Sequence, residues 1–299
     1  MNLSKLSAWA LIASTVCLTA ACTSVPSERV VFDTSPRPEK LYLLTADQQL
    51  LTVRAAQPER VLTRVAVQGL AAGEQLVGID FRVARGILYG LSNRGRLVTI
   101  DTERGVLTPV GAAANPVWGD KAVGFDFNPA ADRLRVVAAG GLNMRLHPDT
   151  GATVDGDAAT AGWQPDPALA YVAGDPGASQ TPEVVAAAYT YNKNNEKLTT
   201  NYALDRRAGT LVMQGSREGT TPVVSPNTGQ LRTVGTLGLG SFVDAAFDIA
   251  DVSGAALAVI RRESPAASEL YLLELSSGRA QYLGRVGDGA AIVGMAIEP

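Results

Sequence analysis

The chain has 299 residues, of which 46% are hydrophobic, and its 26 basic and 29 acidic residues give a formal net charge of −3. This near balance offers no basic stripe for nucleic acid, so we expect no nucleic-acid partner. Beyond the N-terminal segment, roughly 260 residues remain, which is ample for one large hydrophobic core.

The N-terminal segment predicts export and lipidation. Lys5 precedes an apolar stretch over residues 6–21 that is too short, and too rich in Ala, Ser and Thr, to span a membrane comfortably. The phrase "LTAAC" at residues 18–22 resembles the bacterial lipobox, in which the cysteine sulfur carries a diacylglycerol. We therefore predict a signal peptide over residues 1–21 and a lipid anchor to the membrane at Cys22; ordinary secretory cleavage is the alternative.

The residues around Cys22 set further expectations. Thr23 follows it, where an aspartate is the usual signal for retention in the inner membrane, so we expect an outer-membrane lipoprotein that faces the periplasm. Cys17 would be removed with the signal peptide, which leaves the mature chain no disulfide and no thiolate metal site. Residues 22–40 contain three prolines and predict a flexible tether, and residues 41–299 predict one folded domain.

Glycine, proline and short apolar runs predict an all-β domain. The chain has 30 glycines and 16 prolines, and its apolar runs end in turn signals such as "DTERG", "PDTG" and "PNTG". No stripe of apolar residues with a period of 3.6 persists over fifteen residues, so we expect almost no helix.

A strand phrase recurs along the domain. The segment "VGIDF" at 77–81 returns as "VGFDF" at 123–127, and weaker copies lie at 187–189, 245–249 and 293–297. After each of the first four copies the pattern predicts two more strands. A fourth strand follows as a phrase with two glycines, at residues 105–111, 229–235 and 278–284, with a shorter copy at 151–156.

Four short strands repeated every 45 to 60 residues or so are typical of a β-propeller. The last copy, 293–297, is a first strand with nothing after it, whereas the domain opens on two strands within 41–53 that lack a first. We predict that the two ends of the chain share one blade, which closes the ring and leaves no sheet edge. The favoured architecture has five four-stranded blades; six blades, or a β-sandwich, are the alternatives.

The phrase "GFDFNPAADRLRVVAAGGLNMRLHPDTG", with "VVAAAYTYN" further along, resembles the bacterial family named domain of unknown function 4394. The resemblance covers about residues 41–298. It implies a secreted or envelope-located, propeller-like domain, and it brings neither an established activity nor catalytic residues.

The common catalytic arrangements are missing from the sequence. The only histidine, His147, stands before Pro148 at a predicted turn, so no base is evident for a Ser-His-Asp triad. Zinc sites built from histidine and cysteine, dinucleotide fingerprints and P-loops are absent as well. We therefore expect that the protein is not an enzyme, and we predict no catalytic residue, no metal and no cofactor.

Three aspartates hold one position in the repeated first strand, Asp80, Asp126 and Asp248, while two other copies have Ala188 and Ala296 there. The first strands of a propeller line its central channel, so the three carboxylates would converge if they point inward and would suit a hard cation. In the other interpretation, which we favour, each aspartate caps a turn or accepts backbone N–H groups within its own blade.

Arg135, Asn143 and Arg145 form a second candidate site on neighbouring strands of the third blade. Two guanidinium groups could clamp a carboxylate or phosphate of a ligand. Alternatively, they form structural ion pairs with Asp126 or Asp132.

Two functional hypotheses follow. The first is an envelope-anchored, monomeric propeller without enzymatic activity that binds or scaffolds a protein, a glycan or a small ligand. The second is a divalent-cation-dependent hydrolase of the lactonase or phytase type, which would use the three carboxylates of the channel.

Overall fold

The computed structural model describes residues 37–114, 118–119, 121–263 and 266–299. The predicted signal peptide, Cys22 and most of the predicted tether lie outside the described residues. The described part contains no helix that is long and apolar enough to cross a membrane.

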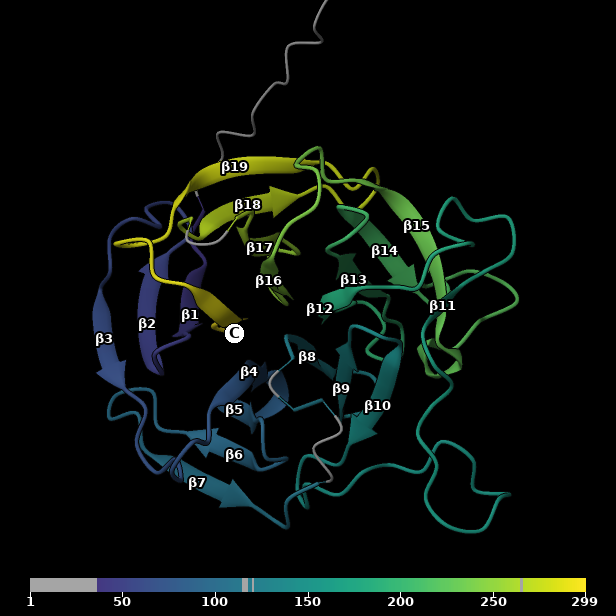
Figure 1. Cartoon of the computed structure of the whole chain (residues 1–299), viewed down its shortest axis with the longest axis horizontal. Coiled ribbons are helices and arrows are strands. Elements are labelled where there is room, and N and C mark those ends of the chain that lie inside the picture. Colours follow the sequence, from purple (N-terminus) through teal and green to yellow (C-terminus); the bar gives the residue numbers. More distant parts are fainter. Residues whose placement is uncertain (1–36, 115–117, 120, 264–265) are drawn as a thin grey trace, which may run out of the picture. The chain divides into compact units, whose positions relative to one another are not determined.

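Five sheets surround a central axis as the blades of a propeller, which confirms the predicted fold (Figure 1). Each blade begins with an inner strand, and these strands contact one another in chain order, with the last returning to the first. The inner strands are β4 (Leu76–Arg82), β8 (Val123–Asn128), β12 (Val184–Tyr189), β16 (Asp244–Ile249) and β20 (Ile292–Ile297).

The outer strands follow in antiparallel order. Blade 1 continues from β20 through β1 (Lys40–Thr45), β2 (Gln49–Arg54) and β3 (Thr63–Ala66). Blade 2 continues from β4 through β5 (Ile87–Ser92), β6 (Leu97–Ile100) and β7 (Leu107–Val110). Blade 3 continues from β8 through β9 (Arg133–Ala138) and β10 (Leu142–Leu146).

Blade 4 has a fifth strand, whereas blade 5 has the expected four. From β12, blade 4 runs through β13 (Asn201–Asp205), β14 (Thr210–Gln214) and β15 (Gln230–Thr236) to the short parallel strand β11 (Ala170–Tyr171). Blade 5 runs from β16 through β17 (Ala256–Arg261), β18 (Glu269–Leu273) and β19 (Ala280–Arg285). The helical content of the described residues is two 3-10 turns, η1 (Val83–Arg85) and η2 (Pro226–Thr228).

The two ends of the chain close the ring as predicted. Strand β20 pairs with β1 in an antiparallel register that places Met295 opposite Leu43 and Ile297 opposite Leu41. The C-terminus therefore lies beside the centre of the ring in Figure 1. Strand β20 is the inner strand of blade 1 and β1 is its neighbour, so the two ends of the chain complete one sheet and leave no gap in the ring.

The hydrophobic core is divided among the gaps between neighbouring blades. Buried apolar side chains of the described residues form a cluster in each gap; the cluster between blades 1 and 2, for example, contains Leu44 and Ile79. The cluster between blades 5 and 1 joins Leu257 to Leu43 and Met295. Each sheet thus buries both faces, which explains why the strands read as nearly continuous apolar runs.

Blade 3 departs from the prediction of four strands. The expected strand at residues 151–156 is reduced to one isolated bridge between Leu146 and Thr153. The chain then leaves the sheet edge, and Arg145 donates to the carbonyl of Asp155 and to the carboxylate of Asp166 in the connection that follows. Two backbone bonds, from His147 N to Ala152 O and from Val154 N to Arg145 O, remain of the expected fourth ladder.

Candidate functional site

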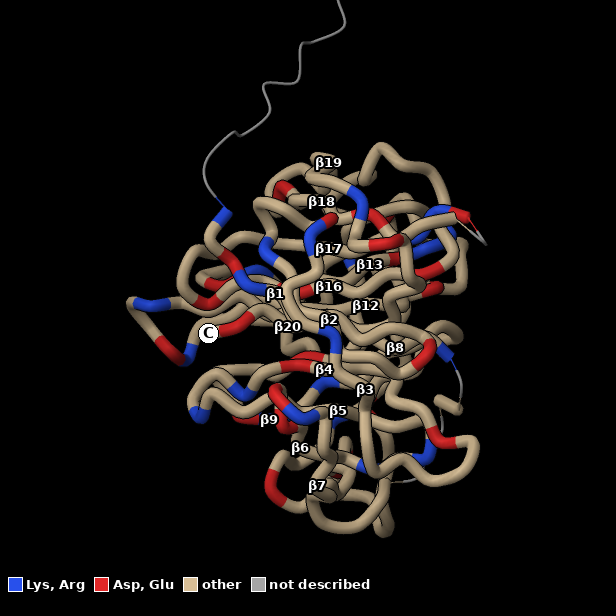
Figure 2. Tube along the Cα trace, turned by 90° about the vertical axis from the view of Figure 1, so that its left-hand side faces the viewer, with Lys and Arg blue, Asp and Glu red and all other residues tan. Residues whose placement is uncertain are grey.

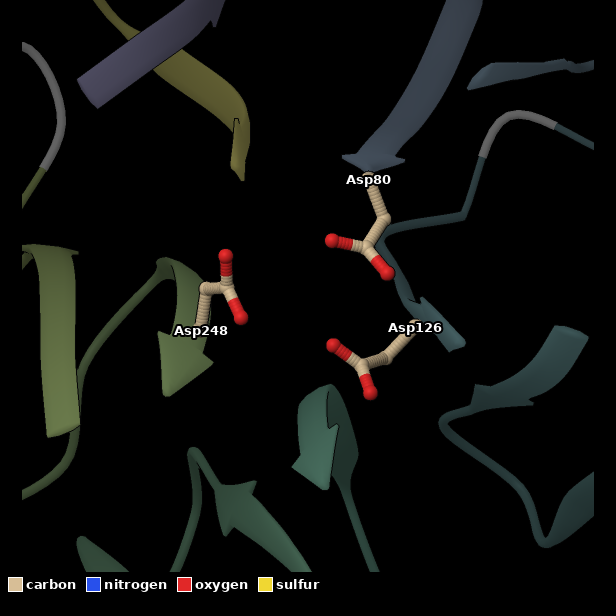
Figure 3. A group of neighbouring side chains, drawn as sticks. All are labelled: Asp80, Asp126 and Asp248. Carbon is tan, nitrogen blue, oxygen red and sulfur yellow. The ribbon is translucent and has the colours of Figure 1, made fainter. Parts of the chain in front are cut away.

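Asp80, Asp126 and Asp248 converge on the propeller axis. They lie at equivalent positions of β4, β8 and β16, and Figure 3 shows their carboxylates turned toward one another. One oxygen of each lies within 4.8 Å of the others, and all three residues are buried. The convergence considered from the sequence is therefore present.

The same aspartates bind backbone N–H groups, but largely of the neighbouring blade. Asp80 Oδ2 accepts from Phe127 N (2.7 Å), Asp126 Oδ1 from Tyr189 N (2.9 Å), and Asp248 Oδ2 from Ile297 N (2.6 Å). Our favoured interpretation, that each aspartate serves its own blade, is therefore incomplete. Every one of the three links its blade to the next around the ring.

The alanines in the repeat explain the remaining bonds. Ala188 lies in the blade before that of Asp248, and Ala296 lies in the blade before that of Asp80. An alanine side chain has no oxygen that could accept an N–H group of the next inner strand. In those two blades the aspartate accepts the N–H of its own successor: Asp248 Oδ1 from Ile249 N (2.6 Å) and Asp80 Oδ1 from Phe81 N (2.8 Å). Five axial N–H groups, which have no ladder partner, are thereby satisfied.

One carboxylate oxygen is left over. Three carboxylates supply six oxygens, and five of them accept the N–H groups just described. None of the described residues donates a hydrogen bond to the sixth, Asp126 Oδ2, although Asp126 is only 3% exposed. This oxygen is free to hold a proton or to accept from a ligand.

A layer of small residues closes the axis beside the aspartates. Two positions before each axial residue, the inner strands carry glycine or alanine: Gly78, Gly124, Ala186, Ala246 and Gly294. A Cβ at Gly78 would come within 2.6 Å of Phe125 Cβ, and one at Gly124 within 2.6 Å of Ala187 N. The glycine of the repeated phrase therefore allows inner strands to approach closely, and the cavity in this layer has only about 10 Å³.

On the other side of the three aspartates the axis opens into a pocket of about 430 Å³. The layer of small residues narrows the axis at the floor of this pocket to about 10 Å³. Its wall combines apolar residues, among them Phe127, Ile249 and Ile297, with six acidic residues. The acidic residues are Asp80, Asp126, Asp132, Glu196, Asp248 and Asp251.

The pocket contains one cationic side chain, Arg82, and that guanidinium is already neutralised. Arg82 Nε donates to Asp132 Oδ1 (2.8 Å) and Nη1 to Asp149 Oδ1 (2.6 Å). Among the described residues, no arginine or lysine pairs with the other five acids of the pocket. Basic and acidic residues are interspersed along the chain in the side view of Figure 2, whereas six acidic residues and one arginine line the pocket.

Burial governs the protonation of the axial aspartates. It raises the pKa of Asp248 to about 6, despite the two N–H groups that this carboxylate accepts. It raises the pKa values of Asp80 and Asp126 well above their usual range, with repulsion from the neighbouring carboxylates adding to the effect. Since Asp126 Oδ2 alone makes no hydrogen bond to the described residues, it is the oxygen that can hold a shared proton without losing an N–H bond.

The second predicted cluster is structural and lies away from the axis. Arg135 Nη1 and Arg145 Nη2 each donate to the carboxylate of Asp166 (2.7 Å each), and Asn143 Oδ1 accepts from Arg135 Nη1 (2.7 Å). The predicted partners Asp126 and Asp132 were wrong. The two guanidinium groups do clamp a carboxylate, but it belongs to the chain itself.

Several residues of the site were missed from the sequence. Asp251 lies in the loop after β16, and Glu196 lies in the loop between β12 and β13. Arg82 lies two residues beyond the repeated aspartate of blade 2. None of these positions recurs in the other blades, so the repeat gave no signal for them. His147 lies at the turn after β10, where its Nδ1 accepts from Asp149 N (3.2 Å), and it does not line the pocket.

Comparisons with known proteins give a family match in sequence and a large number of matches in structure, two of which are distant ones described below. A family model described as "Domain of unknown function (DUF4394)" matches residues 49–296, and no curated protein matches. PorZ, a bacterial surface component of the type-IX secretion system of Porphyromonas gingivalis, is 13% identical with a TM-score of 0.35. The match covers 83% of this chain but only 27% of PorZ. Hydrazine synthase of Kuenenia stuttgartiensis is 9% identical with a TM-score of 0.38, over 85% of this chain and 68% of that one.

Proposed function

The chain belongs to the DUF4394 family, whose model covers most of it, and we propose that it is a ligand-binding propeller that holds a small molecule in its axial pocket. One observation carries the proposal: the axis is narrow on one side of the aspartates, with a space of about 10 Å³, and widens on the other into a pocket of about 430 Å³. Ligand pockets of this kind are concave, largely apolar and equipped with a few convergent polar groups.

The proposal includes a place in the cell. The lipobox-like sequence supports a lipid anchor at Cys22 and a position in the bacterial envelope, with the propeller facing the periplasm. We propose a monomer that meets its ligand there, without nucleic acid and without catalysis. Replacing Cys22→Ser should move the protein from the membrane fraction to the soluble periplasmic fraction, and an unchanged distribution would contradict the anchor.

Blocking the pocket tests the binding function. Ala84 lines the pocket in η1 and is exposed, so Ala84→Trp should fill the entrance without disturbing the core. Both proteins would be incubated with small molecules extracted from bacterial cells and analysed by native mass spectrometry. We expect the wild type to retain a small molecule that the variant does not. Equal retention by both, or retention by neither, would contradict the proposal.

A further inference from the structure

We propose that the ligand of the axial pocket is a small organic cation, whose primary ammonium group lies among Asp80, Asp126 and Asp248 and whose apolar body fills the remaining cavity. This inference rests on the proposed function and names the chemical class of its ligand. It is carried by the charge of the pocket, the geometry of the three carboxylates and the size of the cavity.

The charge of the pocket selects a cation. Five acidic side chains of the wall have no basic partner among the described residues, and the one guanidinium nearby is held by Asp132 and Asp149. Three of these acids are buried, where an unpaired carboxylate is costly. A positive ligand would supply the missing counter-charge, whereas an anion would be repelled by these carboxylates.

The geometry of the floor suits an ammonium group. Such a group has three N–H donors, and at N···O distances of about 2.8 Å it holds three acceptors roughly 4.6 Å apart. The three carboxylates offer one oxygen each within 4.8 Å of one another. Each carboxylate oxygen has two acceptor sites, so the floor can accept an ammonium while the five backbone N–H bonds remain.

Asp126 Oδ2 points independently to a ligand. Asp126 is 3% exposed as a residue and lines the pocket, none of the described residues donates to its Oδ2, and Figure 3 shows its carboxylate turned toward the other two. A carboxylate oxygen at the pocket without a donor from the protein can accept a hydrogen bond from a molecule in the pocket. A proton satisfies this oxygen in the free protein, and the ammonium would take its place.

The size and lining of the cavity favour an organic cation over a metal ion. A volume of about 430 Å³ far exceeds what a single ion occupies, and apolar side chains such as Ile249, Ala250 and Ile297 form part of the wall. Calcium takes about six to eight oxygen ligands at roughly 2.3–2.6 Å. The apolar side chains of the wall add no oxygen ligands to those of the three carboxylates.

A matched set of probes tests the inference by isothermal titration calorimetry. Hexane-1,6-diamine, hexane-1,6-diol and adipate share a six-carbon frame and differ in charge. We expect the diamine to bind the wild type at least ten-fold more tightly than the diol or adipate, and more tightly than calcium chloride. Equal binding of diamine and diol, tighter binding of calcium or adipate, or no binding of the diamine would overturn the inference.

Two substitutions test the position of the ammonium. Asp126→Asn keeps the oxygen that Tyr189 N needs but removes the free oxygen and its charge, so it should weaken diamine binding at least ten-fold. Asp101→Asn is the control, because it also removes one negative charge while retaining the Oδ1 that accepts from Glu103 N and Arg104 N outside the pocket. Equal affinities of both variants would contradict the assignment, and the probe series decides the question even if Asp126→Asn does not fold.

The two proposals fail in distinguishable ways. If Ala84→Trp abolishes the retention of a neutral or anionic molecule, the pocket is a binding site but its ligand is not a cation. If the retained molecule binds the wild type and Ala84→Trp alike, the pocket itself is not the site.

Discussion

The three axial aspartates should respond differently to the same isosteric substitution. Asp80 and Asp248 each use both carboxylate oxygens on backbone N–H groups, whereas Asp126 uses one. Asparagine replaces one oxygen by an NH₂ group. In Asp80→Asn or Asp248→Asn, one buried N–H would face this donor and lose its acceptor, which costs about 1–3 kcal/mol.

In Asp126→Asn, the remaining oxygen still serves Tyr189 N. The new NH₂ group takes the place of the protonated Oδ2 and can donate to the neighbouring carboxylates. We therefore expect a cost below about 1 kcal/mol, within the range of one ordinary hydrogen bond. Urea unfolding at pH 7 measures these differences. The reasoning would be refuted if Asp126→Asn destabilised the protein as much as Asp80→Asn does.

Three further outcomes are expected. Deleting residues 292–299 removes the buried side chains of Ile292, Met295 and Ile297, each of which contributes about 1.5–3 kcal/mol to the stability of the fold. Since the free energy of unfolding of a whole protein is about 5–15 kcal/mol, the melting transition measured by circular dichroism should be lost or shifted to a much lower temperature. An unchanged melting temperature would contradict ring closure. Asp166→Ala leaves the guanidinium of Arg135 buried without its carboxylate and should cost about 3–5 kcal/mol in urea unfolding, whereas a change below 1 kcal/mol would show that the ion pair is dispensable. The pKa values of the axial acids are raised in the folded state, so folding takes up protons and the free energy of unfolding should fall as pH rises from about 4 through 6. The slope should be about 1.4 kcal/mol per pH unit for each proton taken up. Asp126→Asn should make this slope smaller, and parallel pH profiles of variant and wild type would contradict a proton on Asp126. The other titratable or charged groups that face the axial acids across the pocket are Arg82, Asp132, Tyr189, Tyr191, Glu196 and Asp251.

The five blades could be predicted from the sequence because each blade meets the same packing requirement. Each blade must bury both faces and bring a narrow inner strand to the axis, so the same phrase of small residue, apolar residue and aspartate recurs. The orphan copy at 293–297 then predicted the shared blade. The alternation of side chains along a strand also placed the three aspartates on one axis.

The contacts between blades were harder to predict. Whether an aspartate serves its own strand or the next depends on the spacing of inner strands and on the alanines at 188 and 296, which leave two N–H groups without an acceptor from the preceding blade. The pattern of substituted and retained aspartates contains this information, but only once the order of the blades is known.

The irregular part carried no repeat and therefore no signal. Asp166 lies in a long connection between β10 and β11, and its pairing with Arg135 and Arg145 depends on how that connection folds back. The shortened copy of the repeat at 151–156 predicted a strand that the structure does not form. The acids at 196 and 251 entered the pocket through loops whose paths the sequence pattern does not define.

The ammonium site can be observed in a crystal structure of the wild type soaked with hexane-1,6-diamine. We expect density for the probe in the axial pocket, with one nitrogen within hydrogen-bond distance of Asp80, Asp126 and Asp248 and the carbon chain against the apolar wall. Density for the diamine elsewhere on the propeller, with the pocket empty at a concentration that saturates binding in solution, would contradict this expectation.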